Sequence, residues 1–162
     1  MQRFFTVIMT VLIAAGAGCS RSPAKPEGFP ELVPCKIKVI QGGAPLVAAD
    51  VTLIPFDVTG TVWPVGGRTD AAGIAVMRTY GEHVGAPVGQ YRVVVSKLET
   101  ETTAPASTAG DQYRPAQERL YDLVDPALGF PPTTTLQIQI EEGIADYSVD
   151  VGNAVRILKQ QP

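Results

Sequence analysis

The stretch from Gly66 to Lys97 most limits what this chain can fold into, because it contains two extended segments that are each introduced by glycine. The turn Asp70-Ala71-Ala72-Gly73 has an acceptor side chain at its first position and glycine at its fourth, as a type I turn favours. This turn is expected to end one strand and to start the next, Ile74 to Thr79. The second segment is a strand whose apolar face is formed by Tyr91, Val93 and Val95. These features predict antiparallel β-structure.

Alternating apolar residues predict further strands toward both ends of the chain. One runs from Cys35 to Gln41 and ends at a glycine pair, and the next runs from Ala49 to Phe56. Residues 134–140 and 146–151 alternate in the same way and are expected to form a β-hairpin through Glu141-Glu142-Gly143. Turn residues thus recur about every ten positions, which is typical of a β-sandwich of about seven strands.

Three motifs occur in order along this part of the chain. They are a G-x-P turn followed by an A-x-V-x-L-x-P strand between Gly43 and Pro55, a T-D-x-x-G turn from Thr69 to Gly73, and a P-x-G-x-Y-x-V strand entry from Pro87 to Val93. Together they resemble the carboxypeptidase regulatory-like family, whose transthyretin-like domains are common in bacterial secreted proteins and lipoproteins. The resemblance covers most of Cys35 to Lys97 and implies a single Ig-like or transthyretin-like antiparallel β-sandwich. Because the motifs belong to turns and core strands, they imply a fold and not an activity.

The first eighteen residues have the composition of a secretory signal peptide. Arg3 precedes a continuous apolar run from Phe4 to Ala15, which is too short to span a bilayer. Ala17-Gly18-Cys19 resembles the lipobox of bacterial lipoproteins, with Gly16 where that motif usually has leucine. The resemblance implies that residues 1–18 are removed and that Cys19 carries lipid, which would tether the mature protein to a membrane.

Ordinary signal-peptidase cleavage after Ala15-Gly16-Ala17 is the alternative, because these residues also fit the small-x-small rule. It would release a soluble secreted protein that begins at Gly18. A disulfide between Cys19 and Cys35 would then be permitted by the oxidising compartment. With lipid on Cys19, Cys35 has no partner in the chain, and we expect it to be a small buried residue of the first strand.

Composition divides the mature chain into three parts. Residues 19–34 contain four prolines and scattered charges, which is typical of an extended spacer. The sandwich domain is expected to span residues 35–152, followed by a short tail at 153–162. Within the domain, residues 98–133 lose the alternation and contain five prolines, so a long loop is predicted there. The spacing of Leu120, Leu123 and Val124 predicts one short helical turn in that loop.

The sequence contains no catalytic constellation. No serine lies in a G-x-S-x-G motif, and the single histidine, His83, stands between predicted strands and is expected to be solvated. One histidine cannot assemble a usual zinc site without cysteine partners. The carboxylates Asp50, Asp57, Asp70 and Glu82 lack the regular spacing of a calcium loop. We therefore expect no enzyme activity, no metal and no cofactor.

The composition and the predicted location in the cell envelope together favour a binding or structural role. Without the signal the chain has 12 Lys and Arg residues against 16 Asp and Glu residues, so nucleic-acid binding is not expected. Trp63, Tyr113 and Tyr121 are the candidate ligand-contacting aromatics, and each also suits core packing. We expect a non-enzymatic lipoprotein, anchored to a cell-envelope membrane and facing the periplasm or exterior, that contacts an envelope protein or carbohydrate or supports the envelope. The alternative is a secreted β-sandwich without a lipid anchor that binds carbohydrate or another small ligand.

Overall fold

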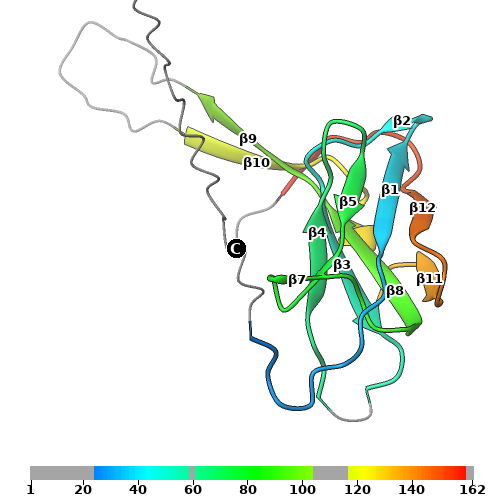
Figure 1. Cartoon of the computed structure of the whole chain (residues 1–162). Helices are drawn as coiled ribbons and strands as arrows, with labels where there is room; N and C mark the ends of the chain where they lie inside the picture. The colour runs from blue at the N-terminus through cyan, green and yellow to red at the C-terminus, as the bar shows by residue number, and fades with distance from the viewer. Residues whose placement is uncertain (1–23, 59–60, 104–116, 160–162) are drawn as a thin grey trace, which may run out of the picture.

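The computed structural model describes residues 24–58, 61–103 and 117–159, which form a β-sandwich with a projecting arm (Figure 1). One layer is an antiparallel sheet with the order β11 (Gln137–Ile140), β8 (Gly89–Ser96), β3 (Asp50–Pro55), β4 (Val65–Arg68), β6 (Arg78–Thr79) and β7 (His83–Val84). The other layer consists of β12 (Asp146–Asp150), β1 (Lys36–Gln41), β2 (Ala44–Pro45) and β5 (Ile74–Val76). The predicted all-β sandwich is confirmed.

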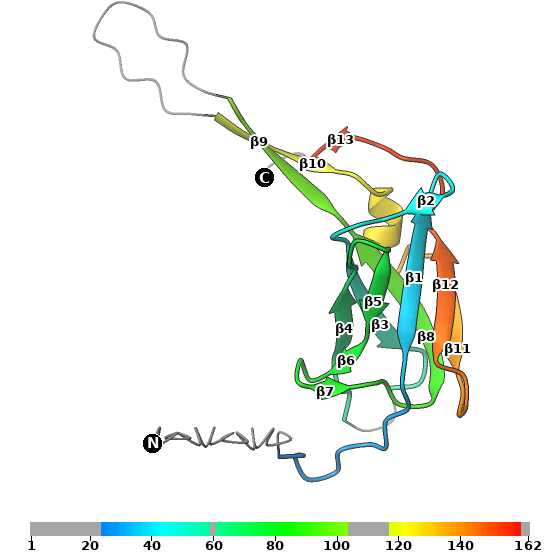
Figure 2. The same ribbon diagram turned by 45° about the horizontal axis from the view of Figure 1, so that its top comes forward.

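The arm is a third sheet that extends away from one end of the sandwich (Figure 2). Its strands are β13 (Ile157–Leu158), β10 (Gln117–Asp122) and β9 (Leu98–Thr103), in that order. The predicted loop at residues 98–133 therefore contains two strands, and a 3-10 helix, η1 (Pro126–Gly129), follows them. Alternation does not signal β9 because Leu98 is the single apolar residue of the strand, so neither face is apolar over its length.

The predicted helical turn at Leu120 to Val124 is wrong. Leu120 lies within β10, opposite Thr100 of β9. The helical spacing of the leucines is overridden by backbone pairing with β9, which uses the hydrogen-bonding groups of this segment. The 3-10 helix begins only after Asp125, whose carboxylate accepts a hydrogen bond from the Ala127 N–H at 2.9 Å.

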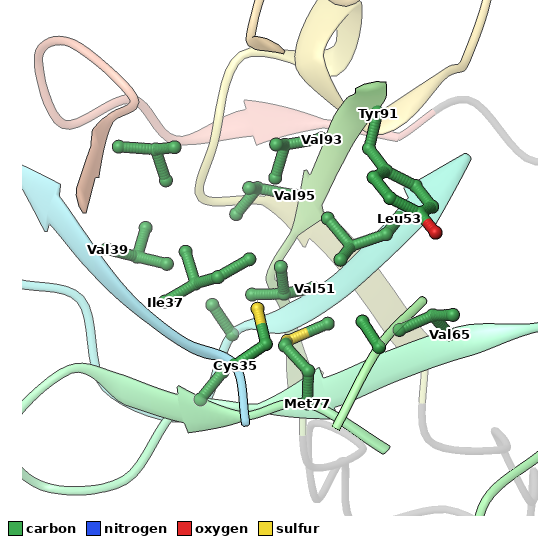
Figure 3. Close-up of a cluster of buried hydrophobic side chains, with 14 of the residues drawn as sticks. Cys35, Ile37, Val39, Val51, Leu53, Val65, Met77, Tyr91, Val93 and Val95 are labelled. Atoms are coloured by element: carbon green, nitrogen blue, oxygen red, sulfur yellow. The ribbon is translucent and has the colours of Figure 1, made fainter. Parts of the chain in front are cut away.

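The core lies between the two layers because β1, β3 and β8 each turn one apolar face inward (Figure 3). In β1, the fully buried Ile37 and Val39 alternate with exposed lysines, as predicted. The predicted inward face of β8 is also confirmed, since Tyr91, Val93 and Val95 are at most 4% exposed. Complete burial of each such valine or isoleucine stabilises the fold by about 1.5–3 kcal/mol.

Cys35 is a free thiol at the base of this core, 1% exposed and directly before β1. This confirms the prediction of a small buried residue. Burial raises the pKa of the thiol to about 11, because the thiolate would lose its hydration. Cys19 lies outside the described residues.

The predicted turn at Asp70 is confirmed. The Gly73 N–H donates to the Asp70 carbonyl oxygen at 3.0 Å, and the Asp70 carboxylate accepts from Ala72 and Ile74 N–H groups. Gly73 has a φ of +74°, and a Cβ there would lie 2.9 Å from the Val39 carbonyl oxygen. Glycine is thus required both by the backbone conformation and by the close approach of β1.

Two predicted strand arrangements are wrong because the chain crosses between the layers. Residues 74–79 are not one strand: β5 pairs with β1, whereas β6, beyond Met77, pairs with β4 in the other layer. The predicted hairpin of residues 134–151 is not formed either, since β11 pairs with β8 and β12 pairs in parallel with β1. Alternation fixes which face of a strand is apolar. A strand can point its apolar face into the same core from either of the two facing layers, so alternation does not decide which strands pair.

The N-terminal segment packs along the end of the sandwich away from the arm before β1 begins (Figure 1). Val33 and Ala86 exchange two backbone hydrogen bonds of 3.0 Å. Val33 also packs against the core, and the ring of Phe29 contacts the rings of Trp63 and His83. The described end of the predicted spacer is therefore attached to the domain.

Candidate functional site

An aromatic cluster joins the N-terminal segment to the sandwich. The Trp63 ring centroid lies 5.1 Å from that of Phe29 and 5.7 Å from that of Tyr80, and both pairs are edge-to-face. His83, in β7, has its ring centroid 4.4 Å from that of Phe29 and is 8% exposed. The prediction of a solvated His83 is wrong because the ring of Phe29, a residue distant in sequence, packs against the His83 ring. Trp63 has the packing role expected of it.

A groove of about 360 Å³ opens beside this cluster. Three segments contribute to it: the N-terminal segment, the β3–β4 connection and the β7–β8 connection. Its large apolar and aromatic lining residues are Phe56, Val58, Val62, Trp63, Val88 and Tyr91. Trp63 therefore packs in the cluster and also lines a concave surface, and its contact with a ligand stays a prediction.

A tyrosine hydroxyl lies in the groove, and a guanidinium lies on one of its aromatic residues. The Tyr91 hydroxyl donates to the Pro87 carbonyl oxygen at 2.9 Å, so its proton is already used in a hydrogen bond within the protein. Burial, and secondarily the nearby Cys35, raises the pKa of Tyr91. The Arg92 guanidinium lies 4.6 Å from the centroid of the Phe56 ring in a cation–π arrangement. These residues supply no nucleophile paired with a base.

Tyr121 lies in the arm, beneath a residue of the C-terminal tail. The Cζ atom of Arg156 is 3.6 Å from the Tyr121 ring centroid. The same guanidinium contacts the carboxylates of Glu101 at 2.7 Å and Glu99 at 3.4 Å. The hydrogen bond from Arg156 lowers the pKa of Glu101, and it raises the pKa of Arg156 itself. Tyr121 therefore helps to hold the tail against the arm, and its ring face is already covered.

β9 is the outer strand of the arm, and its outer edge has no strand partner in the part of the chain that the structure describes. The Lys97 carbonyl oxygen accepts from the Leu123 N–H at 2.9 Å, so residue 97 belongs to a hydrogen-bonded pair of the hairpin. Antiparallel alternation then directs the backbone groups of residues 98, 100 and 102 outward. We call this row the free edge of β9. Rows of this kind accept an additional strand.

The structure separates the predicted site residues. Trp63 lines the groove at one end of the sandwich, and Tyr121 lies in the arm at the other. Tyr113 and Cys19 lie outside the described residues. Nothing in the sequence indicates that Phe29 and Arg156 take part, because one lies in a proline-rich segment and the other in the tail, and their partners are distant in sequence.

The described ranges contain no group of three or more His, Cys, Asp or Glu side chains placed to hold a metal ion. Of the carboxylates considered from the sequence, the Oδ1 atom of Asp50 lies 3.9 Å from Nε of Arg68. The Asp70 carboxylate accepts backbone hydrogen bonds within its own turn. Nor does the described part of the chain include a helix of the length and apolarity needed to cross a bilayer.

Comparison with family models, curated proteins and solved structures finds no match to this chain. Among the described residues, the groove and the free edge of β9 are two surfaces suited to binding.

Proposed function

We propose that this protein is a non-enzymatic lipoprotein of the cell envelope, related to the carboxypeptidase regulatory-like domains, that binds an envelope protein through its arm. The free edge of β9 is the single observation that carries the binding role. The sandwich acts as a rigid support, and lipid on Cys19 holds it at a membrane.

The arm is suited to adding a strand from a partner. β9 and β10 pair over six residues each, which gives a continuous backbone edge along β9. Arg156 braces the arm through Glu99 and Glu101. A braced strand loses little conformational entropy when a partner strand binds. Recognition of this kind relies on backbone hydrogen bonds.

A proline at position 100 tests the proposal. Thr100→Pro removes an outward N–H donor, and because that donor does not face β10, the hairpin is expected to remain paired. Thr100→Val, the matched control, keeps the N–H and the β-branched shape. We expect full-length protein isolated from membranes to retain its cross-linked partner in the Thr100→Val variant and to lose it in Thr100→Pro.

Two results would overturn parts of this function. Capture of the same partner by the Thr100→Pro variant would exclude the free edge of β9 as the binding site. An unmodified N-terminus at Gly18, measured by mass spectrometry of the mature protein, would exclude the lipid anchor. Circular dichroism of both variants shows whether the β-structure is intact.

A further inference from the structure

Exposed apolar side chains gather around the groove. Val58 is 63% exposed, Val88 50%, Val62 48% and Phe56 38%, and all four line the same concavity as Trp63. Single exposed valines are ordinary on protein surfaces, whereas a contiguous group with aromatic members marks a contact surface. We call these five residues the apolar rim.

The predicted lipid site, Cys19, shortly precedes the N-terminal segment that reaches the groove. Pro30 lines the groove, and Phe29 is fixed against Trp63. Cys19 precedes Ala24, the first described residue, by five positions, a span of at most about 18 Å. The N-terminal segment therefore leads to the apolar rim and not to the arm, which extends from the other end of the sandwich (Figure 2).

The chemistry of this end suits a bilayer surface. Trp and Tyr are favoured at the boundary between headgroups and acyl chains, and Trp63 and the 55% exposed Tyr80 lie here beside the valines. The charges of this end are mixed, and carboxylates outnumber cations: Glu27, Glu31, Asp57 and Glu82 against Lys25, Arg78 and Arg92. An excess of carboxylates favours zwitterionic lipid over anionic lipid.

We propose that the apolar rim rests on the lipid surface of the membrane to which Cys19 is anchored. The sandwich then stands upright on the bilayer, and the arm points away from it toward a partner. This inference relies on the proposed function for its lipid anchor, and it adds an orientation and a second contact with the membrane.

Trp63 reports this contact directly, because it is the single tryptophan of the chain. Full-length lipidated protein is reconstituted in phosphatidylcholine vesicles that contain lipid brominated in the upper part of its acyl chains. We expect bromine to quench at least half of the Trp63 fluorescence, and vesicles to shield Trp63 from aqueous iodide. Replacing part of the phosphatidylcholine with phosphatidylglycerol should reduce the quenching by bromine.

A variant of the apolar rim and a matched control locate the contact. Val58→Ser with Val62→Ser should reduce quenching by bromine at least twofold, and both positions are exposed, so the fold is retained. Val76→Ser, at a 41% exposed valine of β5 outside the groove, should leave it unchanged. Mass spectrometry of the same samples establishes whether Cys19 carries lipid. Lipidated protein without quenching by bromine overturns the orientation alone, and shielding from iodide without such quenching also overturns it, because protein and not lipid then covers the groove.

Discussion

The hydroxyl of Thr69 is expected to stabilise the fold mainly through the shorter of its two buried hydrogen bonds; the longer one, of 3.4 Å, is donated to the Ala49 carbonyl oxygen. Thr69 is 4% exposed, and its Oγ1 accepts from the N–H of the fully buried Ala49 at 2.8 Å. Thr69→Val keeps the shape of the side chain and removes this acceptor. A buried donor left without a partner costs about 1–3 kcal/mol of unfolding free energy. Thr69→Ser keeps the hydroxyl and loses one methyl group, which costs about 0.8 kcal/mol.

Urea unfolding followed by Trp63 fluorescence measures both variants. A slope of about 2 kcal/mol per molar urea, typical of small proteins, converts the expected loss for Thr69→Val into a midpoint lowered by roughly 0.5–1.5 M, without a change of slope. The reasoning is refuted if Thr69→Val matches the parent protein, or if Thr69→Ser is the more damaged variant. If Thr69→Val loses more unfolding free energy than Thr69→Ser, the threonine of the T-D-x-x-G turn stabilises the fold mainly through the hydrogen bond of its hydroxyl.

Two further predictions concern the core thiol and the tail. Because burial raises its pKa to about 11, Cys35 should resist maleimide at neutral pH and react in urea, as followed by peptide mass spectrometry; equal labelling in both conditions would contradict this. Arg156→Gln should speed hydrogen exchange at Ile157–Lys159, where the Lys159 N–H donates to the Leu120 carbonyl oxygen. Since Arg156 lowers the folded pKa of Glu101, its stabilisation of the tail is complete above the ordinary glutamate pKa of about 4.3 and is lost as the pH falls through the lower folded value. Exchange corrected for its intrinsic pH dependence should show this loss in the parent protein, and an equal loss in Arg156→Gln would contradict it.

The candidate sites were predictable only in part. Trp63 stood out as the single tryptophan, and the structure places it in both the aromatic cluster and the groove. His83 was predicted to be solvated, because nothing near it in the sequence announces the ring of Phe29. The arm was missed because a strand exposed on both faces lacks the alternation by which strands are recognised.

The sequence by itself determined the inward faces of β1 and β8 and the turn at Asp70. These features depend on side-chain alternation and on the conformational needs of one glycine, which act over a few residues. Tertiary structure alone decided that β11 and β12 lie in different layers and that Phe29 covers His83. Such choices depend on how distant segments bury one another's apolar surface. Several pairings satisfy the same local pattern, and the closure of the whole core selects among them.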